Sequence, residues 1–206
     1  MKKLSMYFAL VILAVMMVGC VSQKQTSREK KAMKIIKKEV RHYVKDGWKS
    51  LSEPPLEYQL MTVYKMRGDV DEKGCRKYIE GNATSVDETY DSALILALNM
   101  SKFSLAEKIE TEIAELIKNN LHTPSQRYAI MLVESVAAST NLMVQKLGRI
   151  ITPVNVYREL PNGYVEVRVI SFYSHDLAMD IFKQILLEDL EKKDECLAKQ
   201  LSQILN

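Results

Sequence analysis

Three adjacent residues near the carboxyl-terminal end of the chain, Ser174, His175 and Asp176, are the residue types of a serine hydrolase. A hydrolase needs them as nucleophile, base and orienting group, and those roles are defined in space. Neighbours in sequence cannot usually meet in these roles, whereas a serine just before an apolar run of helical spacing is a common helix cap. We therefore expect Ser174 to begin a helix, and we assign no catalytic residue.

The histidines do not form a metal-binding pattern. His42, His122 and His175 lie in three different predicted segments, and none has a second ligand at helical or hairpin spacing. The sequence also lacks the glycine-rich phosphate loops and the G-x-S-x-G pattern. We expect no metal, no nucleotide and no other cofactor.

Paired carboxylates are a further source of acid and base chemistry. Four glutamates follow one another along a predicted helix, and a solvated charged face is the common explanation for such a group. They are Glu107, Glu110, Glu112 and Glu115. We expect most of them to lie on the outer, solvated side of this helix.

Two cysteines of the body, Cys75 and Cys196, lie far apart in sequence, and neither belongs to a C-x-x-C pair. An oxidising compartment would let them pair, and free thiols are the simpler interpretation. The sequence leaves both alternatives open.

The amino terminus has the order of a secretory signal. Lys2 and Lys3 precede an apolar run over residues 6 to 18, which is too short to span a bilayer as a permanent helix. The run ends in Met17-Val18-Gly19-Cys20, which resembles the lipobox of bacterial lipoproteins. An ordinary secreted protein or a single transmembrane helix is the alternative.

The resemblance implies that the sulfur of Cys20 receives a diacylglycerol and that the leader, residues 1–19, is removed. Val21 and Ser22 lack the aspartate that resembles an inner-membrane retention signal, and no acidic run like a surface-export signal follows. By analogy, we expect a lipid anchor in the outer membrane, with the protein on the periplasmic face.

Residues 20–50 form a basic arm. Nine basic and two acidic residues lie between positions 24 and 45, although the whole chain of 206 residues has a net charge of only +3. Met33, Ile36, Val40 and Tyr43 recur at helical spacing until Asp46-Gly47, so we expect a basic amphipathic helix. Its membrane-surface candidates are Lys30, Lys31, Lys34, Lys37, Lys38 and Arg41.

Such a helix beside a lipid anchor can add attraction to an anionic membrane. The alternative is a solvated basic face whose apolar stripe packs on the body. Nucleic acid is not an expected partner, because no aromatic platform accompanies the basic residues.

We expect residues 51–206 to form one α+β domain. The first half of its pattern predicts a helix from Pro54-Pro55 to Gly68, a strand over 78–84 and a helix over 90–118 that Asp87 or Thr89 caps. The second half predicts a helix over 124–137, extended chain over 142–156 with Pro153 at a bulge or edge, a strand from 165 and a last helix over 174–205.

Two local patterns refine this fold. Leu160-Pro161-Asn162-Gly163 predicts a tight turn, which would place the charges of the strand at 165–169 opposite Arg158. Small residues at Ala93 and Ala97 predict a helix that lies close against a sheet. We expect a small, mainly antiparallel three-stranded sheet in the order β-α-α-β-β-α, packed by long helices on one face and preceded by the basic helical arm.

These features together resemble known lipoproteins. The lipobox, the alanine-spaced helix, Val133-Glu134-Ser135-Val136 and the hairpin at 157–169 resemble the LPP20-like lipoproteins and the amino-terminal domain of flagellar FlgT-type proteins, over roughly residues 77–185. Nearly the whole chain is similar to uncharacterised lipoproteins of Bacteroidales-type bacteria. Neither group brings a catalytic residue.

We therefore expect a lipid-anchored, periplasm-facing envelope lipoprotein without catalytic activity, acting as a structural or protein-interaction module. Its partners would be the membrane, through the lipid on Cys20, and an envelope protein. The alternative is an envelope hydrolase with an unfamiliar site. A deep pocket gathering His122 or His175 with a serine or carboxylate would favour the enzyme, and an exposed apolar strip would favour the binding module.

Overall fold

The computed structural model describes residues 29–51, 53–120 and 126–205. The chain divides into two compact units, Met1–Asp46 and Gly47–Asn206. In the first unit the described residues form one helix over 29–45, as the spacing of its apolar residues predicts. The helix ends where the backbone N–H of Asp46 donates to the carbonyl of His42 at 2.9 Å.

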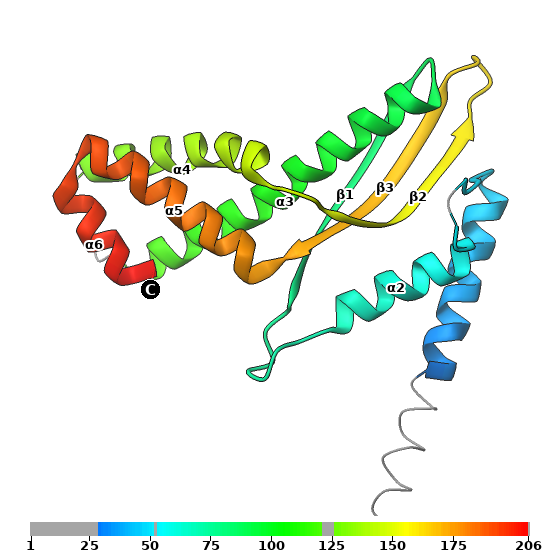
Figure 1. The fold of residues 1–206 in the computed structure, drawn as a ribbon, viewed down its shortest axis with the longest axis horizontal. Coiled ribbons are helices and arrows are strands. Elements are labelled where there is room, and N and C mark those ends of the chain that lie inside the picture. Colours follow the sequence, from blue (N-terminus) through cyan, green and yellow to red (C-terminus); the bar gives the residue numbers. More distant parts are fainter. Residues whose placement is uncertain (1–28, 52, 121–125, 206) are drawn as a thin grey trace, which may run out of the picture. The chain divides into compact units, whose positions relative to one another are not determined.

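The second unit contains five helices and three strands among its described residues (Figure 1). In chain order they are α2 (Leu56–Gly68), β1 (Tyr78–Asp87), α3 (Tyr90–Asn120), α4 (Gln126–Lys146), β2 (Ile151–Glu159), β3 (Val165–Ser174), α5 (His175–Lys193) and α6 (Glu195–Leu205). The expected α+β class with an antiparallel three-stranded sheet is confirmed.

The last strand in sequence, β3, is the middle strand of the sheet. The order is β1-β3-β2 with both pairs antiparallel, and Ile170 of β3 lies between Asn82 and Val154. The predicted turn before β3 is confirmed, because Gly163 has a φ of +84° and its N–H donates to the carbonyl of Leu160 at 2.9 Å. Pro153 was predicted to mark a bulge or an edge strand, and the structure has both: β2 is an edge strand, and its register with β3 shifts between Ile151 and Val154.

Helix α3 covers one face of the sheet through its small residues. Ala93 and Ala97 are completely buried against Val167 and Val169 of β3, so the small-residue ridge lies where the sequence predicts. Gly81 of β1 belongs to the same close contact. A Cβ atom at Gly81 would collide with the carbonyl oxygen of Ser101 and lie 2.8 Å from the side chain of Leu105.

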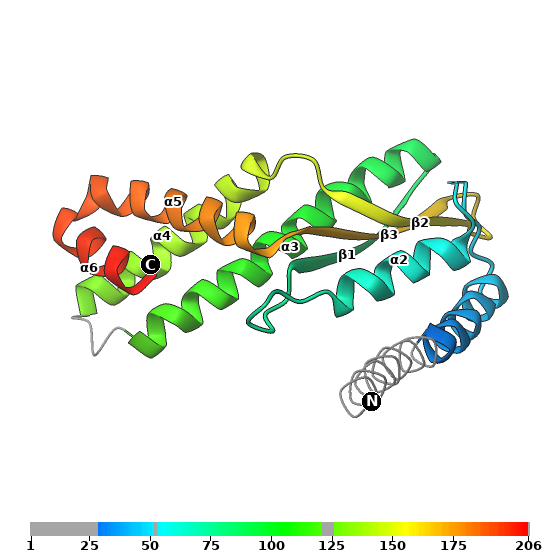
Figure 2. The same ribbon diagram turned by 60° about the horizontal axis from the view of Figure 1, so that its bottom comes forward.

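Helix α2 covers the opposite face (Figure 2). This face carries Ile170 and Phe172, which are 6% and 1% exposed, and α2 buries Leu60 and Val63. The expectation of helices on one face only is therefore wrong. The physical reason lies in β3, where four successive residues from Val169 to Phe172 are buried, so both faces of this strand are covered.

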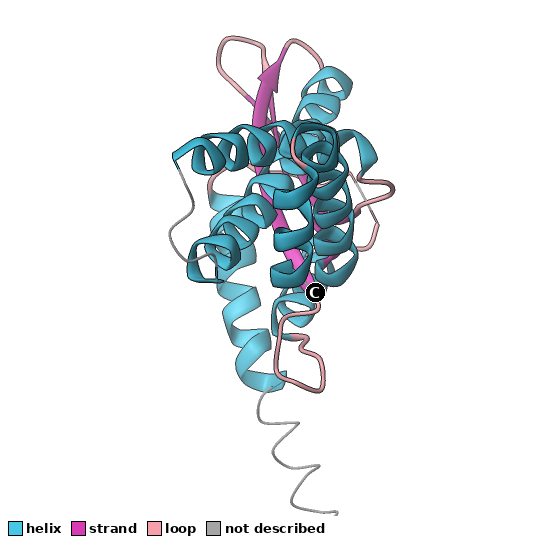
Figure 3. Ribbon diagram, turned by 90° about the vertical axis from the view of Figure 1, so that its left-hand side faces the viewer, coloured by secondary structure: helices cyan, strands magenta, loops and turns pink. Residues whose placement is uncertain are grey.

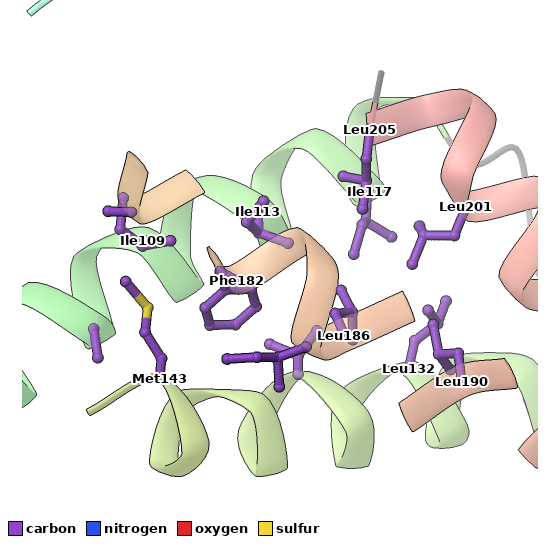
Figure 4. Close-up of a cluster of buried hydrophobic side chains, with 14 of the residues drawn as sticks. Ile109, Ile113, Ile117, Leu132, Met143, Phe182, Leu186, Leu190, Leu201 and Leu205 are labelled. Carbon is purple, nitrogen blue, oxygen red and sulfur yellow. The ribbon is translucent and has the colours of Figure 1, made fainter. Parts of the chain in front are cut away.

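A second core lies beyond the end of the sheet, where the carboxyl-terminal half of α3 packs with α4, α5 and α6 (Figure 3). Phe182 and Leu186 of α5 lie between α3 and α4 in Figure 4 and are completely buried. Helix α3 serves both cores. Its buried residues include Ala93 and Ala97 at the sheet and Ile109, Ile113 and Ile117 in the helical core.

Two predicted segments differ from the structure. The chain over 142–146 is helical, because α4 continues to Lys146 and buries Met143 and Leu147 at helical spacing. The last helix is two helices, since α5 ends at Lys193 and the carboxylate of Asp194 accepts a hydrogen bond from the N–H of Leu197 at 3.0 Å. This bond caps the new helix α6.

Candidate functional site

The predicted lipidation site, Cys20, and the leader over 1–19 lie outside the described residues. The six basic candidates of the arm lie within them. Their side chains are exposed on the helix over 29–45, and they are Lys30, Lys31, Lys34, Lys37, Lys38 and Arg41. A positively charged face is thus present on this helix.

Ser174, His175 and Asp176, the residue types of a hydrolase triad, form a helix cap and a polar contact between helices. The hydroxyl of Ser174 accepts a hydrogen bond from the N–H of Leu177 at 3.4 Å, which confirms the predicted cap. His175 Nε2 lies 2.6 Å from a carboxylate oxygen of Glu112, and its Nδ1 lies 3.6 Å from Asp176. This arrangement joins α5 to α3, and within the described part of the chain no serine hydroxyl hydrogen-bonds to the His175 ring.

Two of the four glutamates of α3 have polar partners on the neighbouring helices. Glu112 contacts His175, and Glu110 accepts a hydrogen bond from the Thr140 hydroxyl at 2.7 Å. Glu107 and Glu115 are exposed. The Glu112 side chain nevertheless remains 45% exposed and Glu110 is only half-buried, so most of this charged group faces solvent as predicted.

The remaining reactive side chains do not gather. Cys75 and Cys196 are exposed free thiols, so the alternative of a disulfide between them is wrong. Within residues 29–51, 53–120 and 126–205, no three His, Cys, Asp or Glu side chains are placed to share a metal ion. His42 is exposed, and His122 lies outside the described part of the chain. Of the helices in the described chain, none has the length and apolar character needed to cross a membrane.

One buried cluster was not predicted. Trp48 is 5% exposed, and the guanidinium groups of Arg158 and Arg168 lie 4.6 and 4.5 Å from its ring centre. Arg158 also contacts Glu166 at 2.5 Å, as the predicted hairpin register requires. The contacts of the two guanidinium groups with the Trp48 ring hold the segment before α2 against the strands.

An exposed apolar stripe runs along the outer side of α3, away from the sheet. We define the α3 stripe as Leu96, Met100 and Phe103, each 44% exposed. Their spacing of four and three residues places them on one side of the helix. The stripe is therefore an apolar surface that remains partly open to water.

The α3 stripe leads toward an apolar groove. Glu107, Glu110 and Ala114 continue the same spacing along the helix, and Ala114 lines a groove of about 550 Å³ between α3 and α4. Ile117, Leu132 and Val136 form its buried floor, while Val133 at its edge is 70% exposed. The outer side of α3 therefore presents apolar surface at both ends, with two carboxylates between them.

Comparisons with protein-family models, with curated proteins and with solved structures found no match for this chain.

Proposed function

We propose that this protein is a lipid-anchored module of the bacterial envelope that binds another protein and catalyses no reaction. Lipid on Cys20 would hold it to the periplasmic face of the outer membrane. The protein partner would be an envelope protein that packs an apolar helix or strip against α3.

The α3 stripe is the observation that carries the proposal. Leu96, Met100 and Phe103 follow the four-and-three spacing by which two helices pack along one another. The residues on the other side of α3, Ala93 and Ala97, already pack on the sheet, so the stripe adds nothing to the described core. A protein partner that covers these large apolar side chains would explain why they are exposed.

The charged helix over 29–45 supports the membrane part of the proposal. Its exposed lysines follow the cysteine that resembles a lipidation site by fewer than thirty residues. One acyl signal alone gives weak membrane binding, and a basic segment is a common second signal.

Site-specific photo-crosslinking in the native envelope tests the protein-binding surface. A benzophenone side chain at Met100 is expected to give a discrete crosslinked product, because this position is on the stripe. The same probe at Glu191, an exposed position of α5, is the matched control. Absence of a product at Met100, or equal products at both positions, would contradict the proposal.

Mass spectrometry of the processed protein tests the anchor. A mature chain that begins at Cys20 with added diacylglycerol is expected, and an unmodified thiol or an intact leader would overturn this part.

Vesicle binding tests the basic arm. In a Cys20→Ser protein, replacing Lys30, Lys31, Lys34, Lys37 and Lys38 with glutamine is expected to weaken binding to anionic vesicles and to leave binding to neutral vesicles unchanged. No change on anionic vesicles would remove the arm from the proposal.

A further inference from the structure

A second surface of α3 faces a cleft that none of the predicted functions uses. The cleft lies between the amino-terminal half of α3 and the start of β2 and has a volume of about 390 Å³. This volume is at the small end of the range for ligand sites, which runs from about 300 to 1,000 Å³. Its lining residues are Leu94, Leu98, Lys102, Gly148, Arg149, Ile150, Thr152 and Asn155.

Two cations lie at this cleft without an acidic partner. Neither Lys102 nor Arg149 forms an ion pair within the described residues, and no acidic residue lines the cleft. By contrast, Arg67, Arg158 and Lys193 are all paired with carboxylates. An anion entering the cleft would meet two uncompensated positive charges, one of them a guanidinium that suits a planar or tetrahedral oxyanion.

The strand side of the cleft adds polar groups. The hydroxyl of Thr152 lies 3.2 Å from that of Ser171, which in turn lies 3.1 Å from that of Ser101, so a line of hydroxyls runs from the buried sheet to the cleft. Asn155 donates to the Tyr90 hydroxyl at 2.7 Å.

The Oδ1 atom of Asn155 is buried and has no hydrogen-bond partner among the described residues. A buried acceptor without a partner is costly. Because the Tyr90 hydroxyl can donate or accept, the Asn155 amide fits in either orientation and can offer an oxygen or an N–H group. Tyr90 holds this buried amide at the strand side of the cleft, and recognition of an anion does not depend on it.

The opposite side of the cleft is apolar. Leu94 and Leu98 of α3 are half-buried beside Ala93 and Ala97, and Ile150 is half-buried at the entry to β2. A ligand that is only a charged group would leave the exposed parts of these side chains uncovered. A ligand that is only apolar would leave the charges of Lys102 and Arg149 uncompensated.

We propose that this cleft binds a small amphipathic anion, with an oxyanion head group against Lys102 and Arg149 and a short apolar chain against Leu94, Leu98 and Ile150. The head group is a carboxylate or a phosphate monoester, which share this recognition chemistry. The site depends neither on the lipid anchor nor on the α3 stripe.

Isothermal titration of the full-length chain in lipid nanodiscs tests the proposal, with empty nanodiscs as the blank. Octanoate and octyl phosphate are the two anionic probes, and the one that binds more tightly identifies the head group. Octanamide has the same chain without the charge, and acetate has the charge without the chain. We expect both of these to bind at least about tenfold more weakly than the better anionic probe.

Lys102→Gln with Arg149→Gln is expected to weaken binding of the better probe by about tenfold or more. The matched control is Lys65→Gln with Lys118→Gln, which removes two exposed charges elsewhere and should leave binding unchanged. Circular dichroism establishes that both variants are folded. Failure of both anionic probes to bind above the blank, equal binding of octanamide, or equal loss in the two double variants would overturn the proposal.

Discussion

At the scale of single residues, Glu80 links α2 to the sheet. Arg67 donates two hydrogen bonds to its carboxylate, at 2.7 and 2.8 Å, and Asn82 donates a third at 2.9 Å. Burial alone would raise the pKa of Glu80. The hydrogen bonds from Arg67 and Asn82, together with the charges of Arg67 and Lys108, outweigh burial and hold the pKa below its ordinary value of 4.5.

This lowered pKa predicts a stability that depends on pH. Ionised Glu80 stabilises the fold above its ordinary pKa, and this contribution is lost as the pH falls through the lowered value. Glu80→Gln should therefore lose less stability than the wild type between about pH 6 and pH 3 in urea unfolding. Glu115→Gln, at an exposed site of α3, is the control and should follow the wild type. An identical pH dependence in the wild type and Glu80→Gln would contradict the prediction.

Gly81 predicts a second residue-scale effect. A methyl group there would meet the carbonyl of Ser101 and the side chain of Leu105, so α3 would have to move away from β1. Overpacking of this kind costs about 1–3 kcal/mol, and Gly81→Ala should lower the free energy of unfolding by that amount. Gly68→Ala is the control, since nothing lies within 4 Å of the added atom. A Gly81→Ala protein as stable as the wild type would show that this contact can relax.

At the scale of elements, the sequence predicted the ends that carry a local signal. The hydroxyl of Thr89, one of two predicted caps for α3, accepts a hydrogen bond from the N–H of Ser92 at 3.2 Å. Ser174 caps α5, and Gly163 makes the turn before β3. Each depends on a few neighbouring residues, so it can be read from the chain alone.

The sequence-based predictions were wrong where the apolar residues fit both a helical and a strand period and tertiary packing decides between the two. Leu142 and Val144 alternate like a strand, but the residue between them, Met143, is completely buried as the next helical position after Val136 and Thr140. Near the end of α3, Leu116 is 36% exposed, whereas Ile117 is buried. The reason is that α3 changes its buried side between the two cores, which a constant helical period cannot describe.

The candidate surfaces were predictable only in part. The exposed arm lysines follow directly from their spacing. The α3 stripe did not, because apolar residues cover most sides of the amino-terminal half of α3 in sequence and its packing on the sheet determines which of them remain outside. The cleft beside Lys102 joins residues more than forty positions apart, and no local pattern links them.

The boundary between α5 and α6 depends on one side chain. Asp194 accepts a hydrogen bond from the N–H of Leu197, and its own N–H donates to the carbonyl of Leu190 at 2.7 Å. Asp194→Ala should lower the free energy of unfolding by about 1 kcal/mol, the usual cost of losing such a cap. Asp180→Ala, at an exposed site inside α5, is the control and should cause no loss, because alanine is the better helix former. Equal effects of the two substitutions in chemical unfolding would argue against a capping role.

At the scale of the second unit, α3 couples two cores that otherwise share few elements. Its 31 residues run from the sheet, where Ala97 is buried, to the helical core, where Ile113 is buried. Helices α4 and α6 have their main contacts with α3 and α5. Loss of the helical core would expose half of α3, and the sheet would then rest on a helix supported over the remaining half.

This shared helix predicts a single cooperative unfolding transition. Trp48, the only tryptophan, lies beside Arg158 and Arg168 of the sheet, so its fluorescence reports on the sheet, whereas far-ultraviolet circular dichroism reports mainly on the helices. The two signals should change together in urea. Phe182→Ala, which creates a cavity in the helical core, should destabilise the protein by about 3–5 kcal/mol and move both midpoints equally, although Phe182 is not in the sheet. A dichroism midpoint that moves to lower urea while the Trp48 midpoint stays in place would mean that the two cores unfold separately.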